Sequence, residues 1–484
     1  MRNRISLRRI PVYFFLYTLS ALGTGCSNET IIDTNPDVAD GVTRWIEQKM
    51  RDQYLWYDEI PDSDVLDFYM DPETFFYTLL SGKDGKNRNG VHYPYSAINK
   101  KSAASKAYMG DGYSFGFEYQ YYYVQNLNKY GLMVLYVLPS SPASEAGLKR
   151  GDWIYAINDA LVPNSDNSAQ LMSLLDTSTP QTLKIGIAER VDKEISRTAS
   201  ITARPVTDNP VFVHQTISLA NGQKAGYLVY NHFTSGPASS EDETFNNSLR
   251  SAFAQFGADN VREFILDLRF NGGGLVSCAQ LLSTMLAPKS ALKNIFCYLT
   301  YNDKVSDNRK PVYLNPDLIE KGVSGANLDL GRLFVITSEH TASASEMIIN
   351  GLSPYMELIR VGGKTEGKNV ASITIASDLY EWELHPIVSR LSNKDGFSDY
   401  SSGFPPTPGF ECDDSKQNDY RQLGDPEEYI LNHILNYIAY GNFAESRTQA
   451  LRLAEETTVI PLYNSLDSKK TNGAVILPAD FYRP

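Results

Sequence analysis

The sequence predicts an α/β protein whose core is preceded by a β-rich domain and by a small helical domain. Strand-like and helix-like apolar patterns alternate between residues 225 and 352, which is typical of an α/β core. Strand patterns dominate residues 113–158, and helical spacing dominates the stretch before residue 80. A chain of 484 residues is also longer than one hydrophobic core usually serves.

The first 25 residues have the layout of a secretory signal. They contain four arginines and no acid, and the apolar segment from Val12 to Leu22 is too short to span a bilayer comfortably. The segment ends at Gly23-Thr24-Gly25-Cys26, which resembles a bacterial lipoprotein cleavage site. Cys26 is therefore expected to carry a lipid anchor, and plain secretion with an incidental Cys26 is the alternative. Residues 26–40 are polar and are predicted to be a tether.

Charge and cysteine content exclude several classes of function. Without the four arginines of the signal, 40 basic and 57 acidic residues leave a net charge of −17, which argues against nucleic acid as a partner. Cys278, Cys297 and Cys412 are widely spaced and form no CxxC pair, so neither a zinc site nor a disulfide framework is indicated. At most one disulfide could form, and no metal or cofactor is expected.

Residues 41–107 are predicted to form the helical domain. Val42, Ile46 and Met50 fall at helical spacing, and a second helix is expected to begin at Asp71-Pro72, an N-cap followed by proline at the first helical position. No chemistry is predicted in this domain.

Residues 108–205 resemble a PDZ domain. Two strand patterns precede Ser141-Pro142-Ala143, a short helix is expected to end at Gly147, and a Gly151-Asp152 turn leads into another strand. The resemblance implies that Phe115, Gly116 and Phe117 lie in a loop whose backbone N–H groups bind a peptide carboxylate, while the peptide adds a strand to the sheet edge. A small β-domain with a glycine bulge is the alternative.

A second motif in this domain is rejected as a nucleophile. Gly112-Tyr113-Ser114-Phe115-Gly116 matches the G-x-S-x-G elbow of α/β-hydrolases, which requires a helix after the serine. The residues that follow, 117–124, have the composition of a strand. An esterase acting through Ser114 is therefore not expected.

Residues 206–442 are predicted to form the core, and two of its turns are candidate parts of an active site. Gly272-Gly273-Gly274 follows a buried strand and permits either a tight turn or an oxyanion hole, while a phosphate loop would need a lysine that is missing. Thr341 to Glu346 lies between a strand and a helix, where Ser343 and Glu346 form a capping-box pattern. A serine at such a helix N-terminus is also suited to act as a nucleophile.

The stretch from Asp267-Leu268-Arg269 to Lys368 resembles the carboxyl-terminal-processing, or tail-specific, serine peptidases. Together with the lipoprotein-like signal, it resembles a Bacteroides-type lipoprotein member of that family. In that family the nucleophile is the first serine of Ser-Ala-Ser-Glu, and the base is a lysine in a glycine turn. Here Lys368 follows Ser343 by twenty-five positions, which is the family's spacing. The resemblance covers roughly residues 40–440 and implies a crotonase/ClpP-like αβ peptidase core.

Carried over, the resemblance makes Ser343 the nucleophile and Lys368 its general base, with the N–H groups of Gly274 and Ala344 as the oxyanion hole. Burial lowers the pKa of a lysine by up to about 3–5 units, which would make Lys368 a base without any histidine. Ser372 stands where several members have a glutamine that orients the lysine. Glu346 is the other possible supporting residue. Two nearby residues are assigned no catalytic role. His340 is interpreted as a turn residue, and the distance of Lys364 from Ser343 in the sequence does not match the family's spacing.

The sequence thus predicts a serine endopeptidase that cleaves envelope proteins or peptides through an acyl-enzyme, recognising their C-termini. It is expected to be lipid-anchored in the bacterial cell envelope, facing the periplasm or the outer membrane. The alternative is a non-catalytic lipoprotein that binds peptides or another ligand on the same fold. Residues 443–484 are predicted to be a helix and an extended tail without function, and the sequence predicts no oligomeric state.

Overall fold

The computed structural model describes residues 36–88, 90–101, 112–163, 168–177, 179–414, 417, 420–443 and 458–467, to which all structural statements refer. The predicted signal peptide, Cys26 and most of the predicted tether lie outside these residues. Within the described ranges, no helix has both the length and the apolar character needed to cross a bilayer. Cys278, Cys297 and Cys412 are free thiols.

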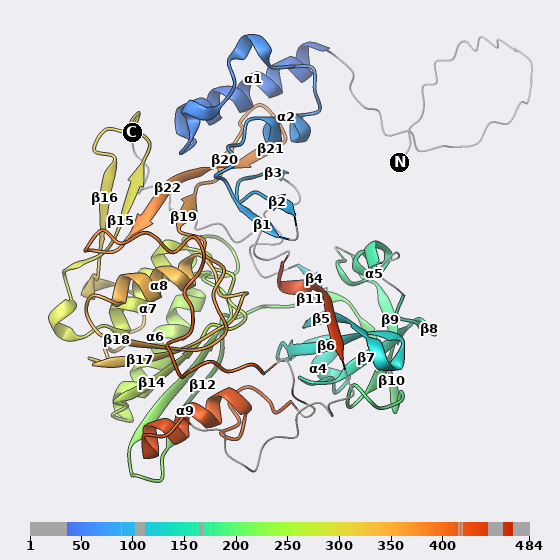
Figure 1. The fold of residues 1–484 in the computed structure, drawn as a ribbon, viewed down its shortest axis with the longest axis vertical. Coiled ribbons are helices and arrows are strands. Elements are labelled where there is room, and N and C mark those ends of the chain that lie inside the picture. Colours follow the sequence, from blue (N-terminus) through green and yellow to red (C-terminus); the bar gives the residue numbers. More distant parts are fainter. Residues whose placement is uncertain are drawn as a thin grey trace, which may run out of the picture.

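The core is built on a five-stranded sheet with the order β12-β13-β14-β17-β18 (Figure 1). The last four strands are parallel, and β12 is antiparallel to β13. The bounds are β12 (Val211–Ser218), β13 (Lys224–Tyr230), β14 (Glu263–Asp267), β17 (Arg332–Thr337), β18 (Glu357–Gly362), and the helices α6 (Thr244–Ala258), α7 (Val276–Leu286), α8 (Ala344–Leu352) and α9 (Tyr429–Tyr440). This alternation confirms the predicted α/β core.

Both faces of this sheet are buried. On β17, Leu333 and Val335 pack into one apolar cluster with α6, α7 and α8, while Phe334 and Ile336 pack into a second cluster with α9. Continuous apolar strands are expected when a parallel sheet is covered on both sides. The carboxyl ends of β14, β17 and β18 therefore meet at one edge, which is the usual place for a functional site in an open α/β sheet.

A second, antiparallel sheet packs against α8 on the side away from the parallel sheet. Its order is β16 (Arg309–Tyr313), β15 (Ile295–Tyr301), β22 (Ile387–Ser392) and β19 (Val370–Ser372). Strand β19 begins two residues after Lys368, so this sheet fixes the turn that carries the lysine.

The β-rich domain, residues 112–205, contains a sheet with the order β10-β9-β7-β6-β5, and β23 is added to β5 at its edge. The bounds are β4 (Tyr113–Ser114), β5 (Phe117–Val124), β6 (Lys129–Val137), α4 (Pro142–Glu145), β7 (Trp153–Ile157), β8 (Ala160–Leu161), α5 (Ser168–Leu175), β9 (Thr182–Ala188), β10 (Arg197–Thr202), β11 (Arg204–Pro205) and β23 (Val459–Asn464). The predicted strands and the short helix after Ser141 are confirmed. A strand, not a helix, follows Ser114, which agrees with the rejection of Ser114 as a nucleophile.

The N-terminal domain contains the two predicted helices, α1 (Pro36–Gln53) and α2 (Pro72–Thr78), and Asp71 caps α2 by accepting a hydrogen bond from Thr74 N at 3.0 Å. The predicted helical domain also contains three short strands that were not predicted. They are β1 (Lys86–Arg88), β2 (Val91–Tyr93) and β3 (Ala97–Lys100).

Strand β3 also corrects a prediction about the core. It pairs with β21 (Trp382–His385), which pairs with β20 (Ile375–Ala376), so these two strands form a sheet with the N-terminal domain. Residues 373–384 lie within the range 206–442 that was predicted to form the core. Their partner β3 lies nearly 300 residues earlier in the chain, and a local sequence pattern does not identify such a partner.

The C-terminal part differs from the prediction in one respect. Helix α9 is capped by Glu428, whose Oε2 accepts from Leu431 N at 2.9 Å. Most of the helix predicted after residue 443 lies outside the described residues, but residues 459–464 form a strand in the β-rich domain.

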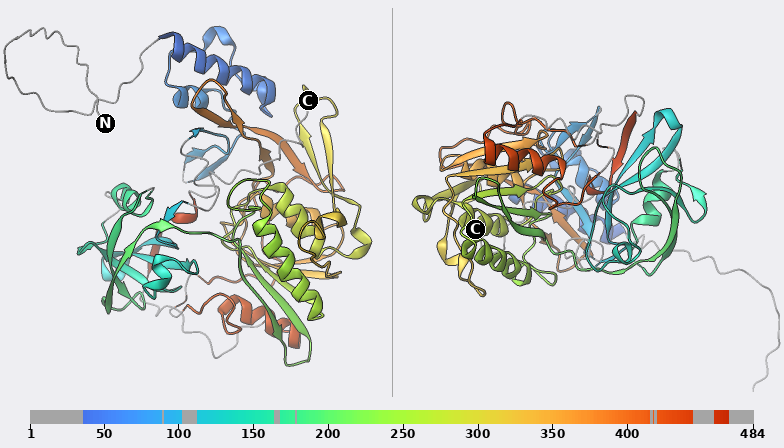
Figure 2. Two further views of the ribbon diagram at one scale, coloured as in Figure 1. Left: turned by 180° about the vertical axis from the view of Figure 1, so that it is seen from behind. Right: turned by 90° about the horizontal axis from the view of Figure 1, so that it is seen from below.

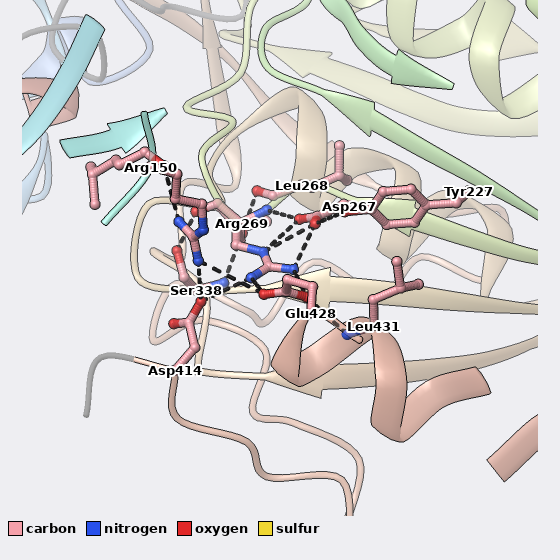
Figure 3. A network of polar contacts seen from close by, with 11 residues as sticks. Arg150, Tyr227, Asp267, Leu268, Arg269, Ser338, Asp414, Glu428 and Leu431 are labelled. Atoms are coloured by element: carbon pink, nitrogen blue, oxygen red, sulfur yellow. Dashed lines mark hydrogen bonds and ion pairs between the residues drawn. The ribbon is translucent and has the colours of Figure 1, made fainter. Parts of the chain in front are cut away.

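A buried ionic network joins the β-rich domain to the core (Figure 3). Arg269 donates to Asp267, Asp414 and Glu428, and Arg150 of the β-rich domain donates to the same Asp414 at 2.9 Å. Burial alone would raise the pKa of Asp414, but Arg269 and Arg150 lower it below its usual value. The network fixes the end of β14, directly before the glycine turn.

Candidate active site

Three turns meet at the carboxyl edge of the parallel sheet. Residues 268–275 follow β14, residues 338–343 follow β17, and residues 363–369 follow β18. Because the three strands are adjacent and parallel, their turns are held side by side. These turns contain every residue of the predicted catalytic group except Ala344 and Glu346, which open α8, and Ser372 on β19.

Ser343 is held in a strained conformation at the start of α8. Its φ of 61° and ψ of −113° lie outside the regions that a residue with a side chain normally adopts. The residue is fully buried, and its Oγ has no hydrogen-bond partner among the described residues. A serine on a strained turn between a strand and a helix is the geometry of a nucleophile elbow.

The glycine turn lies directly against Ser343. Gly273 and Gly274 have φ values of +113° and +137°, which strongly favour glycine. A Cβ on Gly273 would lie 2.7 Å from Ser343 Cβ, and one on Gly274 would lie 2.3 Å from the carbonyl oxygen of Phe233. The backbone N–H groups of Gly274 and Ala344 have no acceptor among the described residues. Both predicted oxyanion donors are therefore available.

Asn271 connects the glycine turn to the end of β13 and to the turn after β17. Its side chain donates to Tyr230 O at 2.7 Å and accepts from Gly273 N at 2.9 Å. Its carbonyl oxygen accepts from Ala342 N and from Ser345 Oγ, both at 3.1 Å. The sequence predicted no role for Asn271, because these contacts depend on how the glycine turn packs against the end of β13 and against the turn after β17.

Glu346 joins the serine turn to the lysine turn. Its Oε2 accepts from the backbone N–H of Ser343 at 3.0 Å and of Lys368 at 2.8 Å, and its Oε1 accepts from Gly367 N and Thr365 Oγ1, both at 2.6 Å. The predicted contact from Glu346 to the N-cap is thus made. Ser343 Oγ lies on the side of the backbone N–H of Glu346 but makes no hydrogen bond to it. The hydroxyl therefore does not cap the helix.

Lys368 is 2% exposed, and its Nζ has no hydrogen-bond partner among the described residues. Burial lowers the pKa of this amine to about 8, while the charges of Asp84, Glu366 and Glu346 partly oppose the shift. A substantial fraction of Lys368 is therefore neutral in mildly alkaline solution and can accept a proton.

The N-terminal domain covers Lys368, which the sequence did not indicate. Lys368 Nζ lies 4.9 Å from the centre of the Tyr95 ring, and Lys86 donates to the carbonyl oxygen of Glu366. Asp84 is fully buried and accepts from the backbone N–H groups of Tyr95 and Ser96. These contacts come from the domain in which no chemistry was predicted, and no local pattern marked them.

A cleft of about 560 Å³ opens beside the lysine turn. Gly367 and Asn369, the two neighbours of Lys368, contribute to its wall. The N-terminal domain supplies Trp56, Lys83 and Tyr95 from the other side. The cleft is therefore a place where an extended chain could pass next to the lysine turn.

Two family models match the chain. Peptidase family S41 matches residues 224–386, and the peptidase S41 N-terminal domain matches residues 41–97. Among solved structures, a Bacteroides fragilis protein assigned to the S41 proteases is 33% identical with a TM-score of 0.68, over 82% of this chain and 97% of that one. The chain belongs to peptidase family S41.

Curated relatives of this S41 chain are more distant. The carboxyl-terminal-processing protease of Picosynechococcus is 24% identical over 273 residues, covering 54% of this chain and 58% of that protein. The chloroplastic carboxyl-terminal-processing peptidase 2 of Arabidopsis thaliana is 25% identical over 256 residues, covering 51% and 44%. The chain thus spans about half the length of the curated relatives it matches.

Within this S41 protein, the structure joins Ser343 and Lys368 through Glu346. Ser372 is fully buried on β19, and its Oγ has no hydrogen-bond partner among the described residues. It is therefore available as a partner for the amine, but its predicted role stays a prediction. Lys364 is exposed, which agrees with its rejection.

Phe115, Gly116 and Phe117 lie at the start of β5 in the β-rich domain. Gly116 has a φ of +82°, and a Cβ there would lie 2.0 Å from Ser141 Cβ. Gly116 N donates to Ser114 Oγ at 2.9 Å, so the backbone forms a tight loop in front of β5. The predicted lipid-bearing residue, Cys26, lies outside the described residues.

Proposed function

We propose that this protein is a serine endopeptidase of the carboxyl-terminal-processing type. The observation that carries the proposal is the bridge made by Glu346. One carboxylate oxygen accepts from the backbone N–H of both Ser343 and Lys368, while the two side chains are buried without hydrogen-bond partners among the described residues. A helix cap alone would not need a buried lysine in this position.

The proposed reaction proceeds through an acyl-enzyme. Neutral Lys368 takes the proton of Ser343 as Oγ bonds to the peptide carbonyl carbon, and the negative charge moves to the carbonyl oxygen. The N–H groups of Gly274 and Ala344 stabilise that oxyanion. The tetrahedral species then expels the amine, which receives the proton from Lys368. Water hydrolyses the ester by the same steps and regenerates Ser343.

The proposed substrates are proteins or peptides with accessible C-termini. The loop at Phe115, Gly116 and Phe117 would bind the terminal carboxylate, as in a PDZ domain, and relatives of the chain are named for carboxyl-terminal processing. The proposed place of action is the cell envelope, with a lipid anchor on Cys26.

The proposal is tested by cleavage and by covalent labelling. Wild-type protein is incubated with an unstructured peptide that has a free apolar C-terminus, and products are identified by mass spectrometry. A fluorophosphonate reagent is then used to label nucleophilic serines. Cleavage together with labelling at Ser343 is the expected result. Peptide binding without either cleavage or labelling would instead support a non-catalytic binding protein.

The pH dependence of the reaction should report the buried lysine. Only neutral Lys368 can accept the proton from Ser343, and its pKa is about 8. We expect kcat/KM to rise about tenfold per pH unit below 8 and to level off above it. The check is the rate of peptide cleavage between pH 6 and 9.5, within the range where the protein remains folded by circular dichroism. A flat profile across pH 8 would contradict the role of Lys368.

Substitution Glu346→Gln should weaken the site in two measurable ways. The amide of glutamine has only one acceptor oxygen. Its NH₂ group would face backbone N–H groups that now donate to a carboxylate oxygen, and two donors cannot form a hydrogen bond with each other. Burial raises the pKa of Glu346 to about 7, so part of the gain from its hydrogen bonds is offset by the cost of burying the charge. We therefore expect the free energy of unfolding at pH 8 to fall by only about 1–2 kcal/mol.

The same substitution should move the pH profile. The negative charge of Glu346 raises the pKa of Lys368, so its removal should shift the rising limb of kcat/KM to lower pH. A loss of stability alone would not move that limb. The exposed Glu339 provides the control, because Glu339→Gln should change neither quantity.

A further inference from the structure

Strand β23 lies along the edge of β5, although it belongs to the last described part of the chain (Figures 1 and 2). The pairing is antiparallel, with Val459 opposite Val124 and Asn464 opposite Gln120. Residues 458–467, called here the C-terminal segment, therefore run from the far end of β5 toward the loop at Phe115–Phe117. This segment closes the one edge of β5 that β6 leaves open.

A bound peptide would need the same edge. In strand addition, a peptide places its terminal carboxylate in the loop before the strand and runs antiparallel to that strand, using its backbone N–H and C=O groups. The C-terminal segment has this direction and uses these groups on β5. The segment and a peptide therefore cannot both occupy the edge.

The contacts of the segment are those of a docked ligand. The Tyr463 ring packs against the apolar cluster of the β-rich domain, and its carbonyl oxygen accepts from Gln120 Nε2 at 2.8 Å. Ser465 Oγ accepts from Tyr119 N at 2.9 Å. In contrast, the side chains of Ile460 and Leu462 leave 39% and 40% of their surfaces exposed. The segment is held by its backbone and by a few side chains, of which Leu466 is buried in an apolar cluster with 2% of its surface exposed.

Asn464 connects this docked strand to the serine turn. Its Nδ2 donates to Gln120 Oε1 at 2.6 Å and lies 2.9 Å from His340 Nε2, and all three residues are buried. His340 also lies 3.7 Å from Asp467, measured between Nδ1 and Oδ1. His340 precedes Ser343 by three residues in the turn after β17. One side chain therefore touches both the peptide edge and the turn that ends at Ser343.

We propose that residues 458–467 are an intramolecular ligand of the β-rich domain. They compete with peptide C-termini for the edge of β5, and their release loosens the turn that precedes Ser343. The inference extends the proposed function, but its tests measure binding and amide exchange, which do not require peptide hydrolysis. A failure of the peptidase proposal would thus be distinguishable from a failure of this one.

Competition by a tethered strand has a predictable size. A segment in the same chain acts at an effective concentration of about 1 mM or more, whereas peptide is supplied at micromolar concentration. The apparent dissociation constant of the peptide is its intrinsic dissociation constant divided by the fraction of molecules whose edge is open. We therefore expect release of the segment to tighten peptide binding by about tenfold or more.

The first test locks the segment in place. Tyr123 and Ile460 are directly opposite each other, so Tyr123→Cys with Ile460→Cys is expected to form a disulfide across the two strands. The substitutions are made in the full chain with Ser343→Ala, and binding of a fluorescent ten-residue peptide with a free apolar C-terminus is measured by anisotropy. Oxidation should weaken binding at least tenfold, and reduction should restore it. Equal binding by the oxidised and reduced forms would overturn the proposal.

The second test weakens the segment instead. Asn464→Ala removes the contacts to Gln120 and His340 and should tighten binding of the same peptide several-fold, whereas Leu462→Ala changes an exposed side chain and is the matched control. Hydrogen exchange should become faster at residues 338–343 in Asn464→Ala only. Unchanged or weaker peptide binding would overturn the competition, and unchanged exchange would overturn the link to the serine turn.

Discussion

Ser343→Ala is expected to lower kcat for peptide cleavage by about 10⁴–10⁶-fold while leaving the protein folded. The loss is large because the substitution removes the atom that forms the acyl bond, and no other group in the three turns can replace it. The neighbouring hydroxyl of Ser345 donates to Asn271 O and is directed into the structure. The measurement is kcat with a saturating peptide, before and after substitution.

The stability of Ser343→Ala separates catalysis from folding. Ser343 Oγ is buried without a hydrogen-bond partner among the described residues, so its removal breaks no hydrogen bond there. Alanine has the same difficulty as serine with a φ of 61°, so backbone strain should not change. We therefore expect an unchanged or slightly raised Tm. A fall in Tm of many degrees would mean that the hydroxyl has a structural role instead.

Ser345→Ala is the matched control for this experiment. Both serines are buried in the same short sequence and differ in their contacts. Loss of the hydrogen bond to Asn271 should cost about 1 kcal/mol of stability and reduce kcat only modestly. A loss of activity as large as that of Ser343→Ala would contradict the choice of Ser343.

The sequence predicted the parts of this site that depend on local geometry. The small residues before α8 and the glycines after β14 are required by backbone angles and close approach, and both leave a mark in the sequence. The four hydrogen bonds of Glu346 were only partly predictable. The capping contact is local, but the bonds to Thr365, Gly367 and Lys368 depend on how two turns are packed.

Other features could not be read from the sequence because they join distant segments. Tyr95 and Asp84 reach Lys368 from a domain in which no chemistry was predicted, and β3 of that domain pairs with β21. Strand β23 pairs with β5 across more than 330 positions. An apolar strand pattern predicts a strand, but it does not state which edge that strand will occupy.

Lys368→Met is expected to lower kcat for peptide cleavage by roughly 10³–10⁴-fold, the contribution of a general base. Methionine has nearly the length and volume of the lysine stem, so the turn should keep its shape. Lys364→Met is the matched control, because Lys364 lies in the same turn and is exposed. Its activity should remain within about twofold of wild type, since surface substitutions usually have small effects.

The same substitution should make the protein more stable, which is a sharper test than loss of activity. The folded state lowers the pKa of Lys368 from 10.5 to about 8, so below pH 8 the buried ammonium destabilises folding by about 3 kcal/mol. This penalty disappears as the pH rises from 8 to 10.5, because the folded protein then gives up the proton before the unfolded chain does. Lys368→Met should therefore raise the free energy of unfolding by about 2–3 kcal/mol at pH 7, with a smaller gain near pH 10. A substitution that removed both activity and stability would show that the lysine holds the fold, whereas a gain of stability with loss of activity is what a buried base requires.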